Sequence, residues 1–202
     1  DYFDVDVSYG LNYDKRNQRF KPTDGYFSKF TQRLPLISKN YSLMNGYEYA
    51  VFHEISENMV TSIRFFGKTI NSLNDENVRV SERLYLSSRR LRGFKQGKVG
   101  PKDEGDFIGG NYASSVNLAT TLPKFLSVLD ETDFKLFFDA GNIWGIDYDD
   151  KLSDNSQIRS SAGLAIDWYT PIGPLSFSLA QPITKASSDV TETFRFNIGT
   201  SF

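Results

Sequence analysis

The chain has 202 residues, no Cys, one His and a formal net charge of −2 at pH 7. Without Cys it has no disulfides and no thiolate metal sites, and its near-neutral charge argues against a nucleic-acid binder with a clustered basic face. No apolar run approaches the roughly 18 residues of a transmembrane helix. Two classes remain open: a soluble all-β domain and a transmembrane β-barrel.

Alternation of apolar and polar residues with period two predicts strands throughout the chain. Pro and Gly punctuate the turns between them, for example at 22–25 and 170–174, and Pro35 is expected to end the second strand. The predicted strands are residues 4–13, 26–34, 41–52, 59–68, 111–118, 134–141, 158–169, 175–180 and 193–202. This pattern gives about nine antiparallel strands and no helical period.

Strand length and the charges on the minor face favour the barrel. A tilted strand needs about nine to eleven residues to cross a bilayer, whereas globular strands average about five or six. A wet lumen accepts charged side chains on the minor face, but a soluble core does not. An antiparallel sandwich with these residues facing solvent remains the alternative. The charged residues on the minor face are Arg33, Glu48, Arg64, Lys68, Asp139, Arg159, Asp167 and Arg195.

The connections mostly alternate between short and long, as periplasmic turns and external loops do in such barrels. Trp168 and Tyr169 near one rim, and Trp144 and Tyr148 near the other, are expected to be interfacial aromatics.

No catalytic constellation is evident in the sequence. His53 lies in a short polar turn without a nearby nucleophile elbow or Cys, so a hydrolytic triad is not expected. The acidic segment 147–154 lacks the Gly and terminal Glu of an EF-hand loop and is expected to be solvated. We therefore expect no enzyme activity, cofactor or metal.

The longest connection, residues 69–110, contains Leu91-Arg92-Gly93-Phe94. This motif resembles the Val-Arg-Gly-Phe signature of the BamA-type outer-membrane assembly factors, in the bacterial surface antigen family. Phe137-Phe138-Asp139-Ala140-Gly141 resembles the Phe-x-Asp-x-Gly strand motif of the same family. Further blocks at 20–25, 97–111, 170–175, 180–182 and 196–199 follow in the same order, so the resemblance extends from residue 8 to residue 202.

The resemblance implies an architecture. Residues 1–202 are expected to be the C-terminal part of a sixteen-stranded barrel, without periplasmic domains, and loop 69–110 is expected to fold inward. Arg92 is then expected to pair with Asp139 inside the barrel, where Gly141 leaves room and Phe94 packs on the wall. The alternative is an exposed Arg92 and an ordinary lumenal carboxylate at Asp139.

The resemblance also implies a function. Phe194, Phe196, Ile198 and a terminal Phe202 resemble the aromatic-terminated signal of outer-membrane barrels, and their strand is a candidate seam for β-augmentation. The implied activity is folding and insertion of β-barrel proteins in the bacterial outer membrane. The implied partners are membrane lipids, client barrels, accessory lipoproteins and another chain or copy that completes the barrel. A TamA-like or two-partner secretion pore is the alternative, followed by a passive porin.

Overall fold

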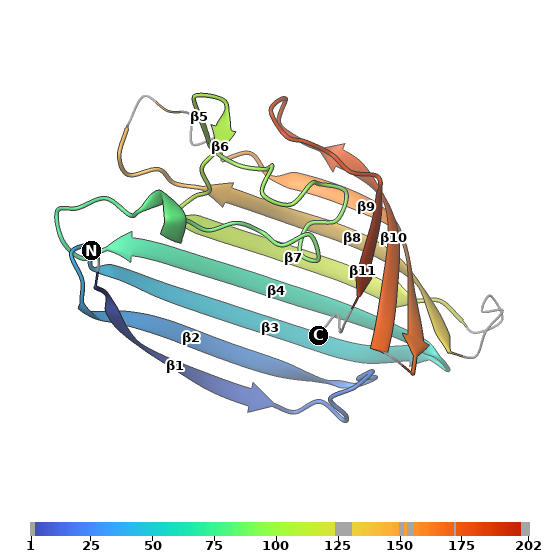
Figure 1. Cartoon of the computed structure of the whole chain (residues 1–202). Helices are drawn as coiled ribbons and strands as arrows, with labels where there is room; N and C mark the ends of the chain where they lie inside the picture. Colours follow the sequence, from blue (N-terminus) through green and yellow to red (C-terminus); the bar gives the residue numbers. More distant parts are fainter. Residues whose placement is uncertain (1–2, 124–130, 150–151, 153–155, 172, 199–202) are drawn as a thin grey trace.

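A computed structural model describes residues 3–123, 131–149, 152, 156–171 and 173–198. They form one curved antiparallel sheet of nine strands with a long loop over its concave face (Figure 1). The sheet contains β1 (Val5–Asp14), β2 (Gly25–Ile37), β3 (Ser42–Ser56), β4 (Met59–Ser72), β7 (Tyr112–Thr121), β8 (Thr132–Trp144), β9 (Arg159–Thr170), β10 (Gly173–Thr184) and β11 (Phe194–Ile198). The loop holds a 3₁₀ turn, η1 (Val80–Glu82), and the hairpin of β5 (Lys102–Asp103) and β6 (Asp106–Phe107).

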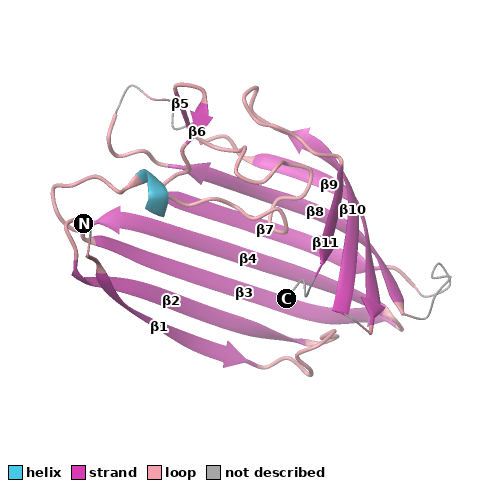
Figure 2. Cartoon of the chain, in the orientation of Figure 1, coloured by secondary structure: helices cyan, strands magenta, loops and turns pink. Residues whose placement is uncertain are grey.

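Each strand of the large sheet pairs with its neighbours in sequence, which leaves β1 and β11 at the two edges (Figure 2). The predicted antiparallel arrangement of nine strands is confirmed, and the alternative of two packed sheets is wrong. Most strands have 10–15 residues, while β11 has five within the described chain. Over the same residues, no helix is long and apolar enough to cross a membrane.

The two faces of the sheet have opposite character. The convex face exposes rows of large apolar side chains from nearly every strand; Leu11 on β1 is 65% exposed, Leu164 on β9 is 51% exposed and Leu179 on β10 is 54% exposed. Water would solvate such rows poorly, whereas lipid tails suit them. The concave face carries small and charged side chains, in agreement with the predicted lumenal charges.

Several strands run beyond their predicted ends; for example, β3 continues to Ser56, β8 to Trp144 and β10 to Thr184. β2 continues through Pro35 to Ile37, because beyond Arg33 its only strand neighbour is β1, and a proline is tolerated where one side of a strand is unpaired. β4 continues to Ser72, opposite Ser42 of β3. The inward loop therefore comprises residues 73–111 rather than beginning at residue 69.

The inward loop, residues 73–111, supplies six of the nine buried residues of the larger apolar cluster. Its residues pack against the concave faces of β4, β7 and β8, which contribute Ile70, Ala113 and Ile143 to one buried cluster. The loop residues of this cluster are Val78, Leu84, Leu86, Leu91, Phe94 and Val99. The core thus lies inside the curve of the sheet, and the loop is an integral part of the fold.

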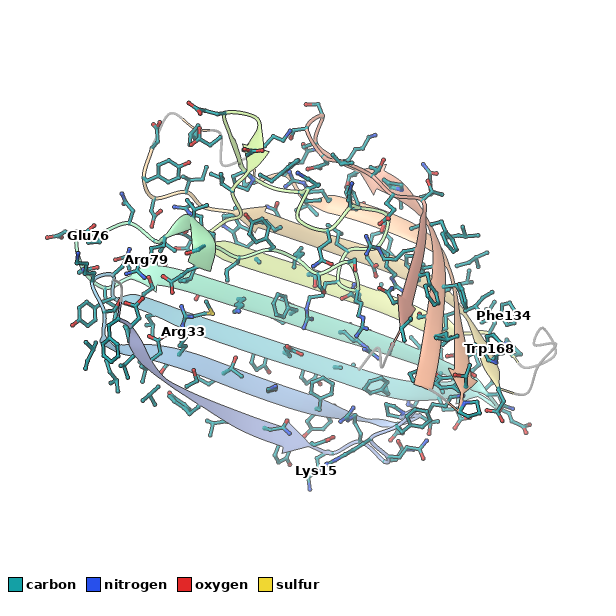
Figure 3. All side chains as sticks on the ribbon, viewed as in Figure 1. Lys15, Arg33, Glu76, Arg79, Phe134 and Trp168 are labelled. Atoms are coloured by element: carbon teal, nitrogen blue, oxygen red, sulfur yellow. The ribbon has the colours of Figure 1, made fainter. Side chains whose placement is uncertain are left out.

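The turn between β1 and β2 reaches across the open end of the curved sheet. Lys21 Nζ lies 3.0 Å from Asp133 Oδ2, and Phe20 packs edge-on against Tyr169 with ring centroids 5.4 Å apart. Tyr169 therefore faces the interior of the curve, and its assignment to an interfacial belt is wrong. Trp168 points outward at this end and is 40% exposed (Figure 3).

Candidate functional site

Arg92 and Asp139 meet on the concave face. Arg92 Nε and Nη2 donate to the two Asp139 carboxylate oxygens, each at 2.7 Å, and the Arg92 backbone N–H donates to Oδ2 at 3.0 Å. Asp139 is fully buried in the middle of β8. A planar guanidinium matches a carboxylate in this bidentate geometry, which gives direction as well as charge neutralisation.

The remaining motif residues shape the surroundings of the Arg92–Asp139 pair, which we call the Arg92 seat. The Arg92 guanidinium carbon lies 3.5 Å from the centre of the Phe137 ring, close enough for a cation–π contact. Gly93 has φ +88°, and a Cβ there would lie 3.2 Å from Ala180 Cβ and Ser161 Cβ. A side chain at Gly93 would therefore be strained by its backbone and crowded by the wall.

Gly141 makes room for the loop. A Cβ at this position would lie 2.9 Å from the Ser114 backbone oxygen and 3.0 Å from Leu86 Cδ1. Phe94 is 2% exposed and belongs to the buried apolar cluster, so it packs on the wall. The structure therefore brings six residues of the two motifs into one region of the concave face: Arg92, Gly93, Phe94, Phe137, Asp139 and Gly141.

Two supporting side chains were missed by the sequence reasoning. Asn117 Nδ2 on β7 donates to Asp139 Oδ1 and to the Arg90 backbone oxygen, both at 2.8 Å. Ser161 Oγ on β9 donates to the Arg92 backbone oxygen at 2.5 Å. Their inner-face position in the period-two pattern was a signal, but many polar residues share that position.

The residues of the last strand lie apart from this site. Phe194, Phe196 and Ile198 point outward from β11 and are 55%, 44% and 68% exposed. The Phe196 ring packs on Phe177 of β10 with centroids 4.9 Å apart. The fourth predicted residue, Phe202, lies outside the described residues.

A second charged cluster fixes the inward loop at the end of the sheet opposite to the turn between β1 and β2. The fully buried Arg83 side chain pairs with Asp147, and Asp147 Oδ2 also accepts from the Val78 backbone N–H at 2.8 Å. Partial burial would raise the pKa of Asp147, but its hydrogen bonds and Arg83 lower it below the ordinary value. Asp147 thus binds the loop, contrary to the expectation of a solvated acidic segment.

A polar cavity of about 530 Å³ adjoins the Arg92 seat. Its lining includes Arg64, Arg90 and Arg92 beside Glu48 and Asp167. Arg90 Nη2 lies 3.0 Å from Glu48, and burial lowers the pKa of Arg90 below its ordinary value. Charged side chains therefore line the interior beside the Arg92–Asp139 pair.

The Omp85 superfamily domain model matches residues 1–202. The chain belongs to the Omp85 superfamily. Omp85 relatives include a protein named outer membrane protein assembly factor BamA from Neorickettsia risticii, 26% identical over 201 residues that cover 97% of this chain. A protein of the same name from Neisseria meningitidis is 34% identical over 139 residues, or 55% of the chain.

The Omp85 fold is also matched in a crystal structure of BamA from Haemophilus ducreyi lacking POTRA domains 1–3. The TM-score is 0.85 with 29% identity, and the match covers 95% of this chain and 41% of that one. A human protein named sorting and assembly machinery component 50 homolog is 27% identical over 152 residues. These matches confirm the predicted resemblance, the barrel fold class and the outer-membrane location. The chain spans 27% of the N. risticii protein and 17% of the N. meningitidis protein.

Proposed function

We propose that this chain forms the C-terminal part of the barrel of a BamA-like factor that folds and inserts β-barrel proteins into the outer membrane. The observation that carries the proposal is the bidentate seat of Arg92 on Asp139, within a nine-stranded sheet that matches a BamA barrel at a TM-score of 0.85. The relatives reported above are named as assembly components rather than enzymes.

The geometry suggests how the parts act. The Arg92 seat keeps the inward loop on the concave face, so the loop fills part of the interior while the convex face of the sheet contacts lipid. In the part of the chain that the structure describes, β11 pairs with β10 over five residue pairs and presents its other edge. A client strand can add to such an edge by backbone hydrogen bonding. In this proposal the seat of the loop is the structural latch, and β11 is the seam.

The partners follow from the same surfaces. Membrane lipids cover the apolar convex rows, and client β-barrel chains meet the edge of β11. Another chain, or the rest of the same protein, completes the barrel at the edges of β1 and β11. Accessory lipoproteins of the assembly machine are the remaining proposed partners, by analogy with the BamA-type relatives.

The test is client folding in proteoliposomes that contain the natural full-length protein with this sequence. We expect the protein to raise the folding rate of an unfolded client barrel above that in empty liposomes, and to give small, irregular conductances. Large, steady channels without faster folding would contradict the proposal and favour a porin. Transport of a secreted protein without faster barrel folding would favour the secretion pore.

A further inference from the structure

The segment between β10 and β11, residues 185–193, is anchored by a second buried ion pair. Arg159, at the start of β9, donates from Nε to Asp189 Oδ2 at 2.9 Å and from Nη2 to Oδ1 at 3.1 Å. Neither side chain is exposed. A bidentate pair with no solvent access holds its partners in one orientation, because either charge alone would be stranded.

The surroundings of the pair fix its two ends. Arg159 Nη1 also donates to Asn142 Oδ1 on β8 at 2.5 Å and to the Gln157 backbone oxygen at 2.7 Å. Asp189 Oδ2 also accepts from the Ala186 backbone N–H at 2.7 Å. The pair therefore joins two neighbouring strands of the wall to a compact turn at residues 186–189.

Immediately after this turn, the chain pairs with the inward loop. The Lys95 N–H donates to the Val190 oxygen at 2.9 Å, and the Val190 N–H donates to the Lys98 oxygen at 3.1 Å. The Glu192 N–H then donates to the Gly93 oxygen at 2.9 Å. Residues 190–192 thus form a short ladder with the part of the loop that directly follows Arg92.

The same segment leads directly into the last strand. The Ala180 N–H of β10 donates to the Thr193 oxygen at 2.8 Å, and β11 begins at Phe194. Four residues therefore separate Asp189 from the edge strand. Within the described residues β11 has five pairs with β10, and the contacts of residues 189–193 add to these in placing it.

We propose that Arg159 and Asp189 are positioning residues that couple the seat of the inward loop to the last strand. The Arg159–Asp189 pair and the ladder act as one unit with the Arg92–Asp139 pair, so that release of either pair loosens β11. The part of this inference that concerns client capture at β11 rests on the proposed function; the coupling itself does not.

The test is hydrogen–deuterium exchange of the full-length protein in lipid nanodiscs, without client. Asp139→Asn weakens the Arg92 seat, and no contact of Asp139 in the described chain involves residues 190–198. We expect about tenfold or faster exchange both at 93–98 and at 190–198, since removing one partner of a buried pair is strongly destabilising. Asp189→Asn, which breaks the other ion pair, should likewise accelerate exchange both at 190–198 and at 93–98.

Lys185→Gln is the matched control, because it changes an exposed charge at the start of the same segment and leaves residues 189–193 untouched. Its exchange should stay within about twofold of the wild type. Coupling is overturned if Asp139→Asn accelerates exchange at 93–98 while 190–198 remains unchanged. The double variant Asp139→Asn/Asp189→Asn gives a second criterion. If it accelerates amide exchange in β11 by the full product of the two single effects, the two pairs act independently and the coupling is overturned.

Two further measurements keep the test independent of folding and of function. Amides of β2 and β3 report whether each variant keeps its sheet. If Asp189→Asn fails to fold, Arg159→Lys takes its place, because it keeps the positive charge but removes the bidentate guanidinium. It should accelerate exchange at 190–198. An unchanged rate there would contradict the role of Arg159. If the exchange data show coupling but the natural protein does not accelerate client folding, the result counts against the proposed function alone.

Discussion

Replacing Arg92 with Ala tests the seat of the inward loop directly. The change removes both side-chain hydrogen bonds to Asp139 and the contact with the Phe137 ring, while the backbone N–H of residue 92 and Asn117 continue to donate to the carboxylate. Hydrogen bonds to a charged group contribute about 1.5–3 kcal/mol each. Water entering from the adjoining cavity recovers part of this energy, so we expect the loop to be destabilised by about 3 kcal/mol.

The assay is cleavage by a protease specific for Lys, because Lys95, Lys98 and Lys102 lie in the loop just after the seat. If cleavage requires local opening of the loop, a loss of about 3 kcal/mol predicts cleavage roughly a hundredfold faster. Such a protease does not cut at Arg, so replacing an arginine neither adds nor removes a site.

Arg90→Ala is the matched control in the same loop. Arg90 pairs with Glu48 at 3.0 Å, but the two side chains are 26% and 37% exposed. An ion pair of this kind contributes about 0–1 kcal/mol, and the contact of the Arg90 guanidinium with the Phe66 ring at 3.6 Å adds about 0.5–1 kcal/mol, so Arg90→Ala should cost clearly less than Arg92→Ala. The reasoning is refuted if Arg92→Ala changes the cleavage rate less than threefold, or if Arg90→Ala accelerates cleavage equally.

Three further predictions concern other parts of the molecule. Gly141→Ala should lower the free energy of unfolding by about 1–3 kcal/mol, measured by urea denaturation, because its Cβ would crowd Ser114 and Leu86. Tyr148 should titrate at about 12, followed as the difference in ultraviolet absorbance between the protein and its Tyr148→Phe variant, because its hydroxyl donates to Asp103 at 2.6 Å. The contribution of this hydrogen bond to the free energy of unfolding is complete below pH 10 and is lost as pH rises through about 12. Leu164→Arg on the convex face should cost about 2–4 kcal/mol in bilayers.

Each of these predictions has its own control. Gly10→Ala places a Cβ at ordinary contact distances of 3.5 Å or more and should be nearly neutral, so an equal loss at Gly10 would count against the crowding argument. Asp103→Asn should move the Tyr148 titration back toward pH 10; no movement would remove Asp103 as the cause. Thr31→Arg, on the concave face, should be tolerated better than Leu164→Arg, and the reverse order would argue against a lipid-facing convex side.

Much of the sheet could be predicted from the sequence, because period-two alternation is a local signal that survives in every long strand. Alternation could not predict that β2 continues past Pro35. Whether a proline ends a strand depends on which side of the strand has a neighbouring strand, and the alternation pattern does not contain that information. Tyr169 is a different case, because period-two alternation itself places it on the opposite face from Trp168: Tyr169 lines the interior and Trp168 is exposed on the exterior.

The candidate site was predictable only where residues form a motif. Arg92 and Asp139 stand out through their glycine and phenylalanine neighbours, whereas Asn117 and Ser161 are ordinary polar residues in ordinary strands. Their importance comes from the docked loop, which brings Arg92 against strands that are 47 and 69 residues away in the sequence. Contacts over such distances leave no local pattern.

The meander of strands has a consequence for the order of folding. Each hairpin of the sheet can form from adjacent segments, but the inward loop can dock only after β8 and β9 supply Asp139 and Ser161. Contacts between distant segments form slowly because chain closure opposes them. We expect pulse-labelled amides at 92–98 to gain protection after those of β2 and β3; the reverse order would contradict this. Docking of the loop would then be a late folding step that occurs only once β8 and β9 have formed.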